Sequence, residues 1–134
     1  MTSIYLNLNN FKVFLKENTQ KNYEFCIYLC NFFLMEISVN DSSDPCSISI
    51  SGEIDLDKSA EVRLAIMNNL NAGKNVNLNL SNVNYIDSSG ISCLIEGTQQ
   101  AAKNNLSFII DKPSDEVLKV IELAFLDKIL KIRK

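Results

Sequence analysis

Histidine is absent from this chain of 134 residues, and so is tryptophan. Without histidine, the chain alone holds no Ser-His-Asp triad, no metal site with histidine ligands and no histidine phospho-relay. Positive charge is also scarce, because 13 Lys and Arg stand against 16 Asp and Glu and leave a net charge of −3. Binding to nucleic acid depends on clustered basic residues that meet phosphates. We therefore expect no direct nucleic acid partner.

The cysteines form no recognisable metal or disulfide pattern, since Cys26, Cys30, Cys46 and Cys93 include no C-x-x-C pair. We interpret them as small buried hydrophobic residues with free thiols. Free thiols fit a reducing compartment, which predicts a cytoplasmic protein. The longest apolar run, Phe25 to Met35, is about half as long as a membrane-spanning helix. We expect no membrane partner, no metal and no cofactor.

The sequence changes character near Met35. Residues 1–34 are rich in Asn and aromatic residues without a sustained period, whereas regular patterns follow Met35. Residues 1–34 are either an N-terminal extension that covers part of the fold or translation from an upstream start. We favour the second alternative, because Met35 stands where the domain pattern begins. Residues 35–134 are predicted to form one domain.

Downstream of Met35, the hydrophobic pattern switches between the periods of strands and helices. Cys46 to Ser51 alternates apolar and polar residues, which is typical of a strand with one buried face. The next segment has apolar residues at helical spacing, with Asp57 as its expected N-cap and Gly73 as its expected stop. The predicted strands are 36–40, 46–51, 76–81, 106–110 and 129–132, and the predicted helices are 58–72, 89–103 and one opened by Pro113.

This order of elements predicts an α/β domain with a mixed, mostly parallel sheet. The first two strands are close enough for an antiparallel hairpin, and strand–helix–strand units favour parallel pairing with right-handed crossovers. A parallel strand that is covered on both faces is a continuous apolar run. The strand at 76–81 instead carries Asn77 and Asn79 on one face. We therefore expect one side of the sheet to be open or thinly covered.

The most specific local feature is Asp87-Ser88-Ser89-Gly90, between the third strand and the second helix. Unpaired N–H groups and the positive end of a helix dipole stabilise an anion at such a place. The fold would tolerate a phosphate on a serine here. Open α/β sheets also place their sites in these loops. Simple helix capping by Asp or Ser is the alternative, and the residues alone leave both interpretations open.

Two motifs make the chain from about Met35 to Lys134 resemble the STAS domains, and within them the bacterial anti-sigma factor antagonists. Gly52-Glu53-Ile54-Asp55 is similar to the Gly-Glu-hydrophobic-Asp ending of the family's second strand. Asp87-Ser88-Ser89-Gly90-Ile91 is similar to the family's phosphorylation loop. The resemblance implies a single STAS-like domain with about three main helices. Ser92 is a departure, because many members carry glycine at this position.

The resemblance implies a partner switch that is controlled by phosphorylation of Ser88. The kinase would be an anti-sigma factor, a serine kinase that uses ATP. The unphosphorylated chain would bind this kinase and free a sigma factor, and a PP2C-type phosphatase would restore it. The chain would be a regulatory binding protein and kinase substrate, not an enzyme. The implied partner-binding residues are Asp55, Asp87, Ser88, Ser89 and Gly90.

Other functions remain open at this point. A STAS domain that is never phosphorylated could serve as a subunit of a lipid-transport or stress-signalling assembly. A receiver-like phosphoacceptor domain also has an Asp after its third strand, and Lys112-Pro113 superficially fits that pattern. It would need an acidic pair for Mg²⁺, but Asp55 and Asp57 are not adjacent. A nucleotide hydrolase has no G-x-x-x-x-G-K loop here to support it.

Overall fold

The computed structural model describes residues 4–8, 11–15 and 35–134. Contacts within the chain divide it into two compact units, Met1–Leu34 and Met35–Lys134. In the first unit, strand β1 (Ile4–Leu8) pairs antiparallel with strand β2 (Phe11–Leu15), a hairpin that the sequence analysis did not predict. Cys26 and Cys30 lie outside the described residues. Whether residues 1–34 belong to the natural protein stays a prediction.

The second unit contains a five-stranded mixed sheet, as the sequence predicted. Its strands lie side by side in the order of the sequence, β3-β4-β5-β6-β7. The β3–β4 pair is antiparallel, and every following pair is parallel. The elements are β3 (Glu36–Asn40), β4 (Cys46–Ile54), α2 (Leu56–Asn71), β5 (Val76–Ile86), α3 (Ser88–Lys103), β6 (Phe108–Asp111), α4 (Asp115–Leu123) and β7 (Ile132–Arg133).

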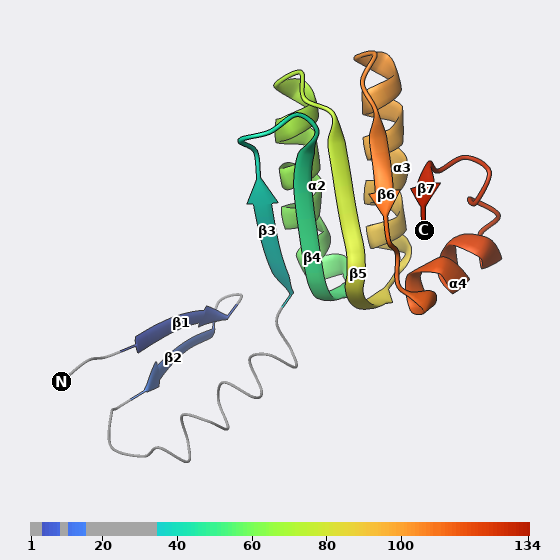
Figure 1. Ribbon diagram of the computed structural model, residues 1–134. Helices are drawn as coiled ribbons and strands as arrows, with labels where there is room; N and C mark the ends of the chain where they lie inside the picture. Colours follow the sequence, from blue (N-terminus) through green and yellow to red (C-terminus); the bar gives the residue numbers. More distant parts are fainter. Residues whose placement is uncertain (1–3, 9–10, 16–34) are drawn as a thin grey trace. The chain divides into compact units, whose positions relative to one another are not determined.

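The sequential strand order explains why the two faces of the sheet differ. Each parallel connection advances by one strand in the same direction, so right-handed crossovers bring successive helices to the same face. Helices α2 and α3 accordingly lie next to each other on one face of the sheet (Figure 1). On the opposite face, Ser47 and Ser49 are exposed, and Asn77 and Asn79 are half-buried. The expected open face is therefore present.

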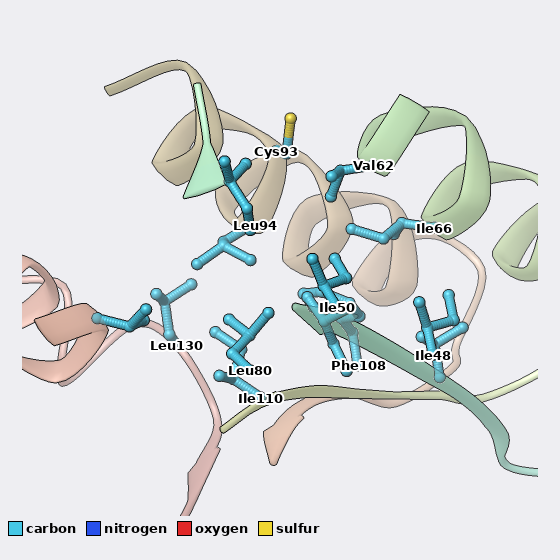
Figure 2. Close-up of a cluster of buried hydrophobic side chains, with 14 of the residues drawn as sticks. Ile48, Ile50, Val62, Ile66, Leu80, Cys93, Leu94, Phe108, Ile110 and Leu130 are labelled. Atoms are coloured by element: carbon cyan, nitrogen blue, oxygen red, sulfur yellow. The ribbon is translucent and has the colours of Figure 1, made fainter. Parts of the chain in front are cut away.

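The core lies between the sheet and its helices. Ile48 and Leu80 from the strands meet Ile66 of α2 and Leu94 of α3, and all four are fully buried (Figure 2). Helix α4 contributes Val117 and Ile121 to the same hydrophobic cluster.

Two cysteines belong to this core. Cys46 and Cys93 are buried free thiols, as the sequence predicted, and burial raises the pKa of both. A thiol with a raised pKa stays protonated at neutral pH and behaves as a small hydrophobic group.

The structure corrects the predicted start of α2. The helix begins at Leu56, and its N-cap is Asp55, not Asp57. The reason is local: Asp55 has an extended backbone, and its Oδ1 accepts a hydrogen bond from the backbone N–H of Lys58 at 3.1 Å. Asp57 is an exposed residue of the first turn. Gly73 follows the end of this helix with a φ of +80°, as predicted.

Leu94 tests the packing of α3 against the sheet. Leu94→Ala should lower the free energy of unfolding by about 2–5 kcal/mol, because the fully buried side chain leaves a cavity. Leu64→Ala is the matched control, since Leu64 of α2 is 61% exposed and should change stability by less than about 0.5 kcal/mol. Urea unfolding measures both. A loss below about 1 kcal/mol for Leu94→Ala would contradict this packing.

Candidate functional site

The two motifs singled out from the sequence meet at one edge of the sheet. Strands β4 and β5 are parallel and end as partners at Ile54 and Ile86. The backbone N–H of Asp87 donates to the carbonyl oxygen of Ile54 at 3.2 Å. The loops that begin with Asp55 and Asp87 are therefore neighbours at the carboxyl end of the sheet, where α2 and α3 start (Figure 1).

Asp87 is the N-cap of α3. Its Oδ1 accepts hydrogen bonds from the backbone N–H groups of Ser89 at 2.9 Å and Gly90 at 3.2 Å. The hydroxyl of Ser89 donates to the same oxygen. This hydroxyl lowers the pKa of Asp87 most, and the backbone amides of Gly90, Ser89 and Leu56 lower it further. Asp87 is therefore ionised at neutral pH, and its negative charge lies against the first backbone N–H groups of α3.

Ser88 and Ser89 have different environments. Ser89 is half-buried, and its hydroxyl is engaged by Asp87. Ser88 is exposed, and its carbonyl oxygen accepts a hydrogen bond from the hydroxyl of Ser92 at 2.8 Å. Within residues 35–134, the Ser88 hydroxyl itself has no hydrogen-bond partner. Of the two serines, Ser88 therefore presents the accessible oxygen.

Gly90 allows α3 to approach the strands closely. A Cβ atom at this position would lie 2.6 Å from Cγ1 of Ile86 and 2.9 Å from Cγ2 of Ile54. Real Cβ atoms do not come so near to other carbons, so a side chain at residue 90 would force the helix or the two isoleucine side chains to shift. The glycine thus permits the close packing of the first turn of α3 against β4 and β5.

Two exposed apolar residues beside the loops, and the contacts of the Cys93 thiol with both helices, were not predicted from the sequence. Leu56, directly after Asp55, is 73% exposed, and Tyr85, two residues before Asp87, is 49% exposed. Beneath the loops, the Sγ of Cys93 lies 3.3 Å from the carbonyl oxygens of both Ser59 and Ser89. Cys93 therefore joins the first turns of α2 and α3. Leu56 lies outside the apolar face of its helix, which is the only sequence signal that marks it.

The family comparison identifies this arrangement. A family model described as "Mlab, STAS domain" matches residues 37–132. The chain belongs to the STAS domain family. Among the described residues of this STAS domain, no helix has both the length and the apolar character that crossing a bilayer requires.

Solved structures share the fold of this STAS domain. An anti-sigma factor antagonist from Mycobacterium paratuberculosis matches with a TM-score of 0.67 and 23% identity, over 74% of this chain and 85% of its own. The anti-sigma factor antagonist SpoIIAA in its unphosphorylated form gives 0.63 and 19%, over 74% and 89%. SpoIIAA of Bacillus in its phosphorylated form gives 0.57 and 17%, over 74% and 92%. At these identities, the likeness establishes the fold.

Gly90→Ala tests the close approach of α3 in the STAS domain. The added methyl group overpacks the contact with Ile86 and Ile54, so the free energy of unfolding should fall by about 1–3 kcal/mol. Gln99→Ala, at an exposed position of the same helix, is the control and should change stability little. Chemical denaturation measures both variants. Equal stability of Gly90→Ala and the parent would mean that the helix lies farther from the strands.

Asp87→Asn tests the charge at the helix N-terminus. The lowered pKa of Asp87 adds stability that is fully present above its ordinary value of 3.8 and is lost as the pH falls through the lower folded value. The variant should therefore be less stable by about 1 kcal/mol at pH 7. This difference should shrink as the pH falls below 3.8. Thermal unfolding across pH measures it, with Asp127→Asn at an exposed turn as control. A difference that does not change with pH would contradict the assignment.

Proposed function

We propose that this STAS domain is an anti-sigma factor antagonist that acts in the cytoplasm as a regulatory binding protein and not as an enzyme. The observation that carries the proposal is the exposed hydroxyl of Ser88 at the N-terminus of α3, which has no hydrogen-bond partner within residues 35–134. The fold likeness to anti-sigma factor antagonists, one of them in a phosphorylated form, supports it. The phosphate acceptor is Ser88, and the donor is ATP bound to an anti-sigma factor serine kinase.

The partner-binding surface is the edge of the sheet around the two capped helices. Its polar part consists of Asp55, Asp87, Ser88, Ser89 and Gly90. Exposed aromatic and aliphatic side chains are common anchors of protein interfaces, and Leu56 and Tyr85 supply them beside the loop.

Phosphorylation acts on this surface through charge. A phosphate adds about −1.5 to −2 charges directly beside the ionised Asp87. Like charge in an interface opposes docking and costs several kcal/mol. The unmodified form therefore binds the kinase and frees the sigma factor, whereas the phosphorylated form is released. A PP2C-type phosphatase restores the binding form.

One other function has a specific observation in its favour. The hydrogen bonds of Asp87 with the backbone and hydroxyl of Ser89 account for the Asp-Ser-Ser-Gly motif as a helix cap alone. A STAS subunit of a lipid-transport or stress-signalling assembly would need the cap without the phosphate. This alternative predicts the same fold and no modification of Ser88.

Phosphorylation of serine variants by the cognate kinase distinguishes the two functions. Ser88→Ala should keep the fold, hold the kinase and resist release by ATP. Ser88→Asp should weaken kinase binding at least about tenfold, without matching phosphate, because it adds one negative charge where phosphate adds nearly two. Ser89→Ala should still accept phosphate. Phosphopeptide mapping by mass spectrometry and a binding assay with the kinase measure these outcomes.

Ser49→Ala, at an exposed serine of the open sheet face, is the control for labelling. Phosphate on Ser89 in the parent, or undiminished labelling of Ser88→Ala, would overturn the assignment of Ser88. Absence of label from every form would favour the unphosphorylated subunit. Nucleotide turnover by the purified chain alone would contradict the proposed lack of enzyme activity.

A further inference from the structure

The three helices of the second unit end in the same hydrogen-bonded motif. In each, the residue after the C-cap is in the left-handed region, and its N–H and the next one donate back to the last turn. The residues at this position are Gly73 with φ +80°, Asn105 with φ +55° and Phe125 with φ +56°. After α4, Phe125 N donates to Glu122 O at 3.0 Å, and Leu126 N donates to Ile121 O at 3.0 Å.

Phe125 is the exception among the three. Glycine and asparagine are the residues that this backbone conformation favours, whereas a bulky side chain is strained there. The phenylalanine gains no burial in exchange, because it is 83% exposed. Phe125 is thus unfavourable in its backbone conformation and in its exposure of an apolar ring to water. Such a residue points to a role in binding and not in stabilising the fold.

Phe125 belongs to a cluster of exposed apolar residues. Leu123 is 74% exposed and Ile129 is 59% exposed, and turn hydrogen bonds fold the chain between them. We call Leu123, Phe125 and Ile129 the C-terminal apolar patch. Seven large apolar side chains of the described second unit are exposed, and three of them lie within these seven positions. All three side chains are more than half exposed.

The sequence segment that carries the patch has a charge opposite to that of the whole chain. Residues 123–134 contain four basic residues and one acidic residue, a net charge of +3, so the other residues of this −3 chain carry −6. Arg133 is paired with Asp111 at 2.8 Å. Lys128, Lys131 and Lys134 are exposed. The segment thus combines exposed apolar side chains with positive charge.

We propose that residues 123–134 bind the surface of an anionic lipid membrane. The C-terminal apolar patch would enter the headgroup boundary, and Lys128, Lys131 and Lys134 would lie against the anionic headgroups. Anionic bilayers attract basic segments and bury adjacent apolar side chains, so they match both features. The expectation of no membrane partner rested on the length of apolar runs, which excludes spanning but not surface binding.

The experiment is flotation of the full chain with lipid vesicles. The protein should float together with vesicles made of equal parts of phosphatidylglycerol and phosphatidylcholine. It should not float with vesicles of phosphatidylcholine alone. Salt at about 1 M, where the screening length falls to about 3 Å, should release it. The Ser88 variants should float like the parent, because the proposal does not depend on that site.

Phe125→Gly is the decisive variant, because glycine fits the left-handed position and the fold should be as stable as the parent or more so. Its binding to anionic vesicles should fall at least about tenfold, since the exposed ring is lost. Ile129→Ser should also weaken binding, whereas Leu64→Ser is the matched control at 61% exposure on α2 and should not. Lys128→Glu should reduce binding, and Lys103→Glu should reduce it less.

Two outcomes overturn the proposal. One is a parent chain that does not bind anionic vesicles, which would assign the patch to a protein partner. The other is vesicle binding that Phe125→Gly and Leu64→Ser leave equally unchanged.

Discussion

The carboxylate of Asp87 organises the edge of the sheet on which the proposed function depends. It caps α3 through the amides of Ser89 and Gly90, and it is also close enough to the amide of Leu56 for that group to lower its pKa. The backbone of Asp87 also links the starts of the two helices, because its N–H donates to the carbonyl oxygen of Ile54, the residue before the N-cap of α2. The close approach at Gly90 holds the same loop from below, against Ile54 and Ile86. The position of Ser88 follows from these two constraints.

Most of the fold of residues 35–134 was predictable, because each element has its own hydrophobic period. The prediction failed where the period changes. Strand β5 alternates up to Leu80, but its next buried residues, Val83 and Ile86, come at intervals of three. The pairing with β4 is irregular at this level, next to Gly52 with φ +96°. Because the prediction relied on strict alternation of apolar and polar residues, it ended this strand at residue 81, five residues before the observed end at Ile86.

The polar part of the candidate site was predictable, and its apolar part was not. The Asp87 to Gly90 motif placed a carboxylate, two hydroxyls and a glycine at a helix start, where the structure has them. Hydrophobic patterns do not reveal that Tyr85 is exposed, and the position of Leu56 outside the apolar face of its helix is the only signal that marks that residue. The same limit applies to Phe125, since its left-handed backbone is set by the end of α4 and by no local sequence signal.

In the proposed function, the Ser88 hydroxyl would separate partner binding from protein turnover, because it has no hydrogen-bond partner within residues 35–134. Marginally stable proteins that lose hydrogen bonds unfold more often and are degraded faster in cells. Asp87, Ser89 and Gly90 hold the loop without the Ser88 side chain, so a group attached to that oxygen removes no bond of the fold. Under the proposed function, phosphorylation of Ser88 would therefore change what the molecule binds and would not make the protein unfold or be degraded faster. Under that proposal, the same copy of the protein would be able to pass through many cycles of phosphorylation and dephosphorylation.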